Sequence, residues 1–297
     1  MSIKSISYSI GIRKIENNKT LIDDKNCLAN FSFFKNTAFH WLADPFLISH
    51  NNHVYVLAEK CNRLTLKGHI VYKDITTPNS KWQKCLADKY HLSFPAVRFE
   101  EDHFLLMPES HKRKAIRLYK SNSLDFSNAS FETLLSGHSF VDSVYVRVEN
   151  DDMLITYIDN SFGEKPELKL YKGQDNTYSL IGSIFDENLK YRPAGYPFRY
   201  KQKLILPTQD CAKNYGGGVI LNDVSTKPFA VKPIFEITSD DCNKILSKTN
   251  VVGIHTYNSA GGYETIDILS EEFHFWGLLE KIFRKFKSLF QRKKPLK

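Results

Sequence analysis

The sequence lacks the cysteine patterns that build disulfide frameworks or zinc sites. It contains five cysteines, an odd number, and no CxxC pair. A disulfide framework requires paired cysteines, and short zinc motifs require closely spaced ones. We therefore expect buried free thiols in a reducing compartment, at Cys27, Cys61, Cys85, Cys211 and Cys242.

Long apolar segments are also missing. The N-terminal stretch MSIKSISYSIGIRKIENN has no continuous apolar core and no small-residue cleavage site. Nowhere do about 18 apolar residues follow one another, as a membrane-spanning helix would require. The sequence accordingly predicts a cytoplasmic protein without a membrane span.

Acidic residues are absent from the C-terminal end, and this accounts for the net charge of +8. Residues 281–297 hold eight of the 41 Lys and Arg, which leaves 33 basic and 33 acidic residues in positions 1–280. The body of the chain is therefore neutral. It lacks the basic surface that nucleic acid requires, so no nucleic-acid partner is expected.

What the sequence does contain is a core-forming composition and a repeat. Hydrophobic residues make up 42% and aromatic residues 13% of the 297 positions, enough for a sizeable core. Five segments share one outline, in which a short strand and a polar turn precede an apolar or alternating strand. They are DPFLISHNNHVYVLAE (44–59), FPAVRFEEDHFLLMPES (94–110), DSVYVRVENDDMLITYID (142–159), AGYPFRYKQKLILPTQD (194–210) and GIHTYNSAGGYETIDIL (253–269).

The spacing of these segments favours one fold. Their starts lie 50, 48, 52 and 59 residues apart, and further strands are expected at 68–75, 115–121, 167–173 and 218–224. Units of three or four strands at this period are typical of propeller blades. The sequence thus predicts an all-β, five-bladed β-propeller over residues 1–270. A β-sandwich built from the same hairpins is the alternative.

The N-terminal segment 5–15 is an orphan strand, while the fifth unit is short. Pairing the two would close the ring and remove both exposed edges. We expect this closure.

Polar residues at equivalent places in the units are expected to meet at one end of the channel, because the first strand of each blade lines it. Asp44, Asp142 and His255 stand at strand starts, whereas Glu59 and Glu109 close second strands. Arg192 precedes unit four. A carboxylate-rich pocket with aromatic rings suits a carbohydrate. The candidates are Asp44, Glu109 and Asp142 as catalytic residues and Glu59, Arg192, Gln209, Asp210, Tyr215 and His255 as substrate-binding residues.

Each candidate also has a structural interpretation. An Asp before Pro is often a turn cap, and strand-end glutamates are often exposed. His255 could be a structural histidine and Arg192 an inter-blade ion-pair partner. The glycines of YGGGV favour a tight turn over a phosphate-binding loop, because no strand-to-helix setting surrounds them.

At these residues the chain resembles a known module. ADPF, FPAV followed by PES, VDSV, RPAG, PTQD with YGGGV, and GIHT resemble a propeller found beside glycosyltransferase and formyltransferase domains. This module includes the N-terminal region of plant glucosamine inositolphosphorylceramide transferases. The resemblance covers roughly residues 40–270.

A more distant resemblance is to the five-bladed glycosidases and fructosyltransferases of the arabinanase and levansucrase type. It implies that Asp44 is a base or nucleophile and Asp142 an auxiliary carboxylate. The Glu that serves as the catalytic acid in those enzymes has no counterpart in unit four, which has Asp210 in its place. Glu109 stands instead in unit two.

The C-terminal segment carries a separate signal. Apolar residues at three- and four-residue spacing alternate with Lys and Arg over residues 275–297. This pattern predicts a basic amphipathic helix within a tail of residues 271–297, binding an anionic membrane surface. A helix packed across the bottom of the propeller is the alternative.

We therefore expect a membrane-peripheral glycosyltransferase on the inner face of the membrane, acting in surface polysaccharide or glycolipid biosynthesis. It would take an activated sugar donor and a lipid-linked or glycan acceptor, with Arg192 and His255 holding the donor phosphate. No DxD-type motif is convincing, so neither a metal nor another cofactor is predicted. A glycoside hydrolase and a non-catalytic carbohydrate-binding module remain as alternatives.

Overall fold

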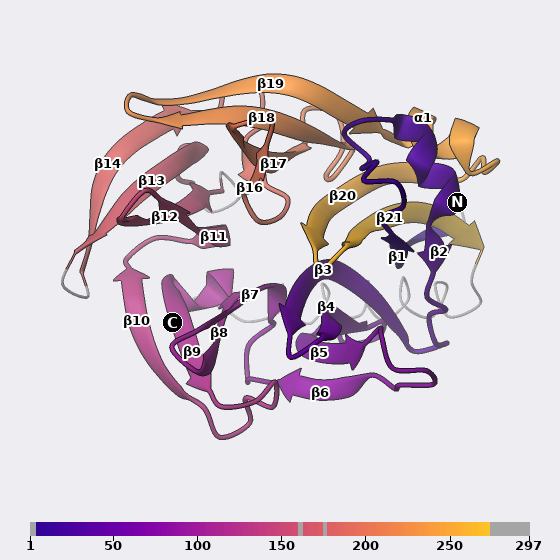
Figure 1. The fold of residues 1–297 in the computed structure, drawn as a ribbon, viewed down its shortest axis with the longest axis horizontal. Helices are drawn as coiled ribbons and strands as arrows, with labels where there is room; N and C mark the ends of the chain where they lie inside the picture. Colours follow the sequence, from indigo (N-terminus) through magenta and orange to yellow (C-terminus); the bar gives the residue numbers. More distant parts are fainter. Residues whose placement is uncertain (1–3, 160–162, 175–176, 274–297) are drawn as a thin grey trace, which may run out of the picture.

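The computed structural model describes residues 4–159, 163–174 and 177–273. Over these residues, five antiparallel sheets stand around a common axis, as Figure 1 shows. Each sheet is one blade, and the predicted all-β, five-bladed propeller is confirmed. The described helices are short: η1 (Lys25–Asn30), η2 (His111–Arg113) and α1 (Ser239–Ile245).

The blades follow one another along the chain. Blade I contains β3 (His40–His50), β4 (His53–Asn62), β5 (Gly68–Asp74) and β6 (Gln83–Leu86). Blade II contains β7 (Ser93–Glu100), β8 (His103–Glu109), β9 (Ala115–Ser121) and β10 (Ser130–Ser136). Blade III contains β11 (Phe140–Val148), β12 (Asp151–Ile158), β13 (Glu167–Gln174) and β14 (Thr177–Phe185). Blade IV contains β15 (Arg192–Pro193), β16 (Phe198–Tyr200), β17 (Lys203–Asp210), β18 (Gly218–Thr226) and β19 (Phe229–Thr238).

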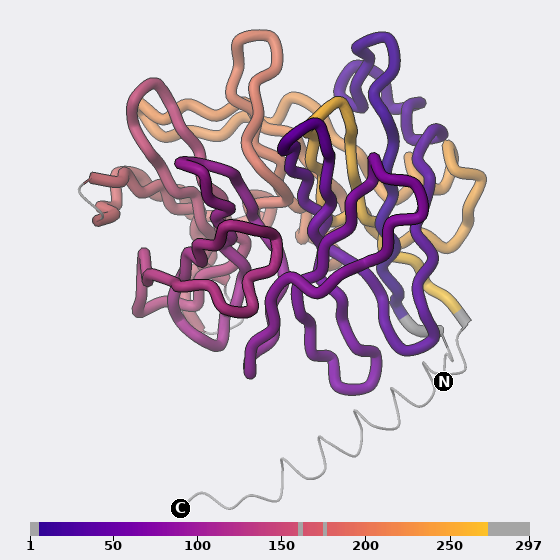
Figure 2. The backbone as a smooth tube through the Cα atoms, turned by 60° about the horizontal axis from the view of Figure 1, so that its bottom comes forward, coloured from indigo at the N-terminus to yellow at the C-terminus, as the bar shows by residue number. Residues whose placement is uncertain are grey.

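Blade V is shared between the two ends of the described chain. It contains β20 (Val251–Ala260), β21 (Tyr263–Phe273), β1 (Lys4–Lys14) and β2 (Ser32–Phe33). β1 pairs with β21 along its whole length, from Lys4 opposite Phe273 to Lys14 opposite Tyr263. Figures 1 and 2 show the indigo and yellow strands side by side. The predicted closure is confirmed, and β21 continues past the expected boundary at residue 270.

Tight hairpins connect the two inner strands of most blades. The turn residues Asn51 and Asn52 both have positive φ, of 48° and 63°, as do Gly261 and Gly262, of 59° and 78°. Two-residue turns of this kind match the right-handed twist of the flanking strands. The polar turns in the repeat therefore fix the hairpin register.

The core lies between the blades rather than at the axis. One buried cluster joins blades I to IV, and a second joins blades IV and V. The rings of Phe46 and Phe94, at matching places in blades I and II, meet edge to face with centroids 4.8 Å apart. Apolar contact between neighbouring blades thus stabilises the ring and leaves its axis to polar residues.

Two predictions concern the membrane, namely an amphipathic C-terminal helix and the lack of a membrane-spanning helix. The predicted amphipathic helix over 275–297 lies outside the described residues. Within the described ranges, no helix is both long and apolar enough to cross a membrane.

Candidate functional site

A β-bulge lies near the start of the inner strand in four of the blades. The bulges direct Asp44, Asp142 and His255 into the channel. In blades I, II and III the ladder slips at the same place, and the bulged residues Asp44, Phe94 and Asp142 have φ of 51°, 45° and 47°. In blade V the ladder slips around His255. Bulges aim a side chain away from the regular pleat, and left-handed non-glycine residues mark positions that the surrounding structure must hold. The predicted equivalence of Asp44, Asp142 and His255 is confirmed.

The second strands add two more carboxylates. Glu59 in β4 lies opposite Ala43, and Glu109 in β8 lies opposite Ser93, each at the edge of a bulge. Their side chains are only 9% and 7% exposed. The alternative that these glutamates are exposed strand ends is wrong.

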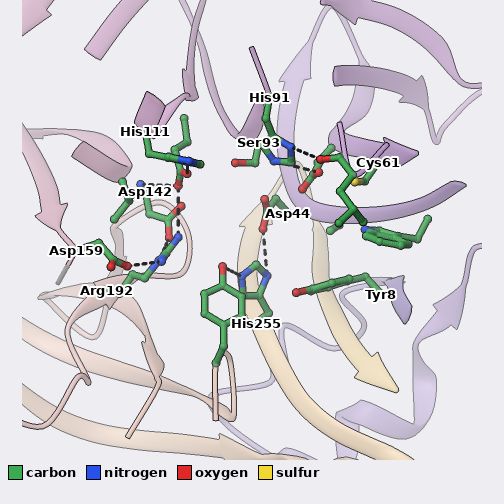
Figure 3. A pocket seen from close by; sticks show the side chains of 17 residues that line it. Tyr8, Asp44, Cys61, His91, Ser93, His111, Asp142, Asp159, Arg192 and His255 are labelled. Carbon is green, nitrogen blue, oxygen red and sulfur yellow. Dashed lines mark hydrogen bonds and ion pairs between the residues drawn. The ribbon is translucent and has the colours of Figure 1, made fainter. Parts of the chain in front are cut away.

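These side chains surround a cavity of about 330 Å³, which we call the first mouth of the channel. Figure 3 shows the labelled side chains, among them Asp44, Asp142 and His255, directed toward a common space. Seven of the nine predicted site residues line it: Asp44, Glu59, Glu109, Asp142, Arg192, Tyr215 and His255.

Arg192 at the start of β15 ties blade IV to blades II and III. Its Nε donates to Asp142, its Nη1 lies 3.0 Å from an oxygen of Asp159, and its Nη2 lies 3.4 Å from an oxygen of Glu109. The interpretation of Arg192 as an inter-blade ion-pair partner is therefore confirmed. That it holds a donor phosphate stays a prediction, and such a phosphate would compete with the three carboxylates that the guanidinium already contacts.

Asp142 and Glu109 share this arginine but differ electrostatically. Burial, with the negative charges of Glu109 and Asp44, raises the pKa of Asp142 although Arg192 opposes the shift. Burial would also raise the pKa of Glu109, but the hydrogen bond with His111 and the charge of Arg192 lower it to about 2. The two carboxyl groups therefore differ in pKa, with that of Asp142 raised and that of Glu109 lowered.

His255 connects Asp44 with a buried acid behind it. Its Nδ1 hydrogen-bonds Asp267 at 3.2 Å, and its Nε2 lies 2.9 Å from the hydroxyl of Tyr215. Burial lowers the pKa of His255, but Tyr215, Asp267 and Asp44 together raise it well above its usual value. We infer an imidazolium ion, which places a positive charge beside Asp44.

Asp44 links two blades through one oxygen and faces His255 through the other. Its Oδ2 accepts from the backbone N–H of Phe94 at 3.0 Å, so it is no local turn cap. Its Oδ1 lies 3.1 Å from Nδ1 of His255, but no hydrogen bond reaches it from any described residue. A buried acceptor without a hydrogen bond is costly. A hydroxyl group bound in the first mouth would supply that bond.

Aromatic rings form one wall of the first mouth. The rings of Tyr8 and Trp41 lie 6.0 Å apart, and Tyr215 packs on His255 with centroids 5.1 Å apart. Burial raises the pKa of Tyr8 to about 12, so its hydroxyl stays neutral. Aromatic faces beside carboxylates are the surfaces that bind sugar rings and their hydroxyl groups.

The two remaining predicted residues lie elsewhere. Gln209 lies behind the first mouth, where its Nε2 donates to Asp142 at 3.1 Å. Asp210 points away and pairs with Lys190 at 3.1 Å, so its predicted place in the pocket is wrong. Side chains alternate along a strand, and only one of two neighbours can face the channel. Gly217 closes the predicted turn between β17 and β18 by bonding the carbonyl of Asp210.

Several residues of the first mouth were not expected from the sequence. Asp159 ends a repeat segment, and Asp267, which lies behind the mouth, alternates with apolar residues in TIDIL, which was a usable signal. The other missed residues lie outside the repeat segments, on β1, near the ends of other strands or in connections, where the repeat has no fixed outline. They are Tyr8, Trp41, Ala43, Cys61, Leu66, His91, Ser93, His111 and Val141.

Comparison with known proteins gives one family. Residues 27–232 match the family model described as "Glucosamine inositolphosphorylceramide transferase 1, N-terminal". The transferase of that name from Oryza sativa subsp. indica is 26% identical over 202 residues, which cover 61% of this chain and 26% of the rice protein. Its counterpart from Arabidopsis thaliana is 27% identical over 188 residues, or 60% and 24% of the two chains. The chain thus spans about a quarter of the length of these relatives.

Solved structures of similar shape are glycoside hydrolases. An alpha-L-arabinofuranosidase from Podospora anserina, in complex with cellotriose, aligns with a TM-score of 0.57 and 10% identity over 80% of this chain and 92% of that one. The catalytic domain of a Coprinopsis cinerea GH62 alpha-L-arabinofuranosidase gives 0.56 and 11%, over 78% and 91%. At such identities the likeness concerns the fold alone.

Proposed function

The chain belongs to the family of the N-terminal domain of glucosamine inositolphosphorylceramide transferase 1, and from this membership we propose that it transfers a sugar from an activated donor to a lipid-linked or glycan acceptor. The role would lie in surface polysaccharide or glycolipid biosynthesis. The observation that carries the proposal is the first mouth, where Asp44, Glu109 and Asp142 meet beside aromatic rings. The relatives are named as transferases of a sugar to a lipid, and this name supports the choice of acceptor.

The residues have separate roles in this proposal. Asp44 has an oxygen without a hydrogen bond and acts as the base, or stabilises positive charge at the anomeric carbon. Asp142, whose pKa is raised, donates the proton that the leaving oxygen receives. Glu109 positions Arg192, which in turn holds Asp142. Because the cavity is rich in carboxylates, the neutral sugar enters it and any donor phosphate stays outside.

Two other functions stay open. The hydrolase neighbours share the fold, and a hydrolase would use water in place of the acceptor. A non-catalytic sugar-binding module is favoured by one fact, that the matched region is only the N-terminal part of longer transferases.

One assay separates the three functions. The purified chain is supplied with nucleotide sugars and a lipid-linked acceptor, and separately with oligosaccharides in water, and products are followed by mass. We expect transfer to the lipid-linked acceptor. Release of free sugar would indicate the hydrolase, and sugar binding without turnover on either panel would indicate the module.

We also propose that residues 275–297 bind an anionic membrane on its inner, cytoplasmic face. The basic, amphipathic pattern of the sequence supports this proposal. Truncation should follow Phe273, because the N–H of Glu271 still bonds the carbonyl of Asn250 within blade V. The truncated chain should keep its thermal transition and no longer sediment with anionic liposomes. Aggregation, or loss of the thermal transition, would place the tail in the core instead.

A further inference from the structure

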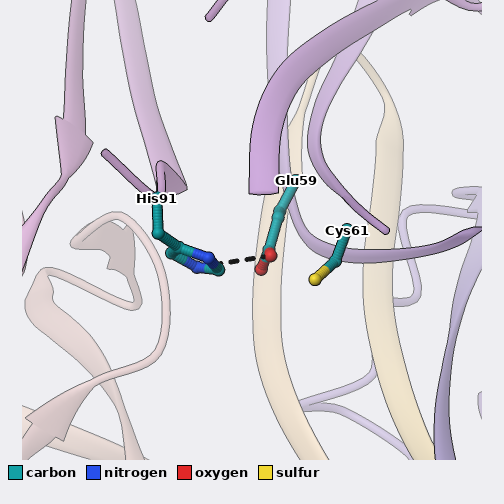
Figure 4. Close-up of side chains that lie close together, drawn as sticks. All are labelled: Glu59, Cys61 and His91. Atoms are coloured by element: carbon teal, nitrogen blue, oxygen red, sulfur yellow. Dashed lines mark ion pairs between the residues drawn. The ribbon is translucent and has the colours of Figure 1, made fainter. Parts of the chain in front are cut away.

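A group of three metal-ligand side chains lies at one edge of the first mouth. Glu59 and Cys61 come from β4, and His91 comes from the connection between β6 and β7. Their oxygen, sulfur and nitrogen ligand atoms all lie within 4.8 Å of one another. Figure 4 shows the three side chains directed toward a common point, with Glu59 between the other two.

The backbone explains why these donors meet. Glu59 and Cys61 are two residues apart on one strand and therefore share a face of the sheet. Gly68 lies opposite Cys61 in β5, where a Cβ atom would approach Oε1 of Glu59 to 2.4 Å. Glycine at this place leaves room for the carboxylate, so the donors are held against the backbone on one side and open to the cavity on the other.

His91 is held from behind by the backbone of the β4–β5 connection. Its Nδ1 lies 3.0 Å from the N–H of Gly68 and 3.2 Å from the carbonyl oxygen of Leu66. Its Nε2 faces Glu59, with 3.4 Å between this nitrogen and Oε1. That spacing also suits two neighbouring ligands of a tetrahedral ion whose bonds are about 2.0–2.3 Å long.

We propose that Glu59, Cys61 and His91 bind a divalent metal ion of the zinc class, with a fourth position open to the first mouth. A thiolate, an imidazole and a carboxylate form the mixed donor set that Zn²⁺ accepts, and hard cations such as Mg²⁺ avoid sulfur. Three protein ligands and one open position are the arrangement of catalytic zinc sites. The ion would bind water or a sugar hydroxyl there.

The charge of the first mouth supports a cation. Among the described residues that line it are five carboxylates, against one arginine and the imidazolium of His255. That arginine contacts Glu109, Asp142 and Asp159, whereas Glu59 has the imidazole of His91 as its ion-pair partner.

Metal binding requires one local change. With the metal on Nε2, the ring proton resides on Nδ1, where the carbonyl of Leu66 accepts it. Metal-bound histidines commonly donate in this way to a backbone carbonyl. The N–H of Gly68 then gives up its bond to the ring.

A second group of close donors, Asp44, His255 and Asp267, is less suited to a metal. Oδ1 of Asp267 accepts from the N–H and the hydroxyl of Thr256, and Oδ2 accepts from the N–H of Asp44. Its oxygens are therefore occupied by protein donors.

Cobalt substitution tests the proposal without any sugar assay, so its outcome is independent of the proposed function. The full chain is stripped with a chelator and titrated with Co²⁺. We expect one Co²⁺ per chain, a tetrahedral visible spectrum and a thiolate-to-cobalt charge-transfer band, all removed by added Zn²⁺. Zn²⁺ should also raise the melting temperature of the stripped chain.

Matched variants identify the ligands. Cys61→Ser should abolish the charge-transfer band, while Cys211→Ser, which changes a cysteine outside the group, should keep it. Glu59→Gln and His91→Gln should each weaken Co²⁺ binding at least about tenfold, with circular dichroism confirming the fold. Absence of stoichiometric binding by the wild-type chain would overturn the proposal. So would a band that persists in Cys61→Ser, or unchanged affinity in both other variants.

Discussion

The two mouths of the channel are built from the same inner strands but differ in chemistry. The first mouth collects strand starts and is lined by five carboxylates around Arg192. A second cavity, of about 420 Å³, collects the strand ends, and we call it the second mouth. The described residues that line it include Arg98, Arg147 and Arg199 and no carboxylate. One repeat therefore places carboxylates at one end and arginines at the other, where Arg98 and Arg147 pair with acids outside the cavity.

The two mouths also differ in how far their ion pairs are exposed to solvent. The side chain of Arg192 is 12% exposed, whereas that of Arg147, which pairs with Glu100 and Asp152, is 52% exposed. Breaking a buried pair leaves an uncompensated charge, while exposed pairs contribute little. Ion pairs of similar geometry should therefore differ several-fold in energy, because burial sets their strength.

The largest effect is expected for Arg192→Met. Removing the guanidinium leaves Asp142, Asp159 and Glu109 without their common partner. Loss of one partner of a buried pair costs about 3–5 kcal/mol of unfolding free energy. Urea denaturation measures the loss directly. A change below about 1 kcal/mol would mean that the first mouth is as well solvated as the second.

Asp44→Asn is expected to act on turnover rather than on folding. The amide keeps the size of the side chain but removes its charge, so sugar transfer should fall by roughly 10²-fold or more. Sugar binding should survive, as measured by calorimetry. Asp142→Asn should lower transfer by a similar factor, because an amide cannot donate the proton that the leaving oxygen receives. Transfer at the wild-type rate in Asp44→Asn would exclude this residue from the mechanism.

The pH dependence of the unfolding free energy should reflect the titration of His255. Its folded pKa is raised, so its contribution is complete below about pH 6.5, its ordinary pKa, and is lost as pH rises through the folded value. Each pKa unit of the shift corresponds to about 1.4 kcal/mol. The unfolding free energy, measured from pH 6 upward, should therefore decline, and His255→Gln should flatten the curve. If the unfolding free energy falls equally with pH in the wild-type chain and in His255→Gln, the inference that His255 is an imidazolium ion is wrong.

The smallest effect is expected at the second mouth. Arg147→Gln removes contacts with Glu100 and Asp152, but the half-exposed side chain limits the loss to about 1 kcal/mol or less. Sugar transfer should be unchanged. A loss as large as that of Arg192→Met would remove the distinction between the two mouths.

The repeat was sufficient to locate the blades and the bulged positions. Asp44, Asp142 and His255 were found because each stands at the start of a repeat segment, and strand starts meet at one end of a propeller. Asp210 was misplaced because the motif PTQD does not show which of two neighbours faces the channel. Its backbone pairs with Gly218 while Gln209 turns inward to Asp142.

The repeat pattern alone predicted the five-unit ring, its closure by the N-terminal strand and the gathering of acids at one mouth. These features follow from strand periodicity and turn chemistry, which are local properties. The packing of the blades sets how Arg192 is shared among three carboxylates, which oxygen of Asp44 lacks a hydrogen bond and which residues meet at Glu59. His91 lies 32 positions from Glu59 in the sequence and comes from the connection between blades I and II. Such contacts depend on how the blades pack, and burial in that packing sets the charge of each group.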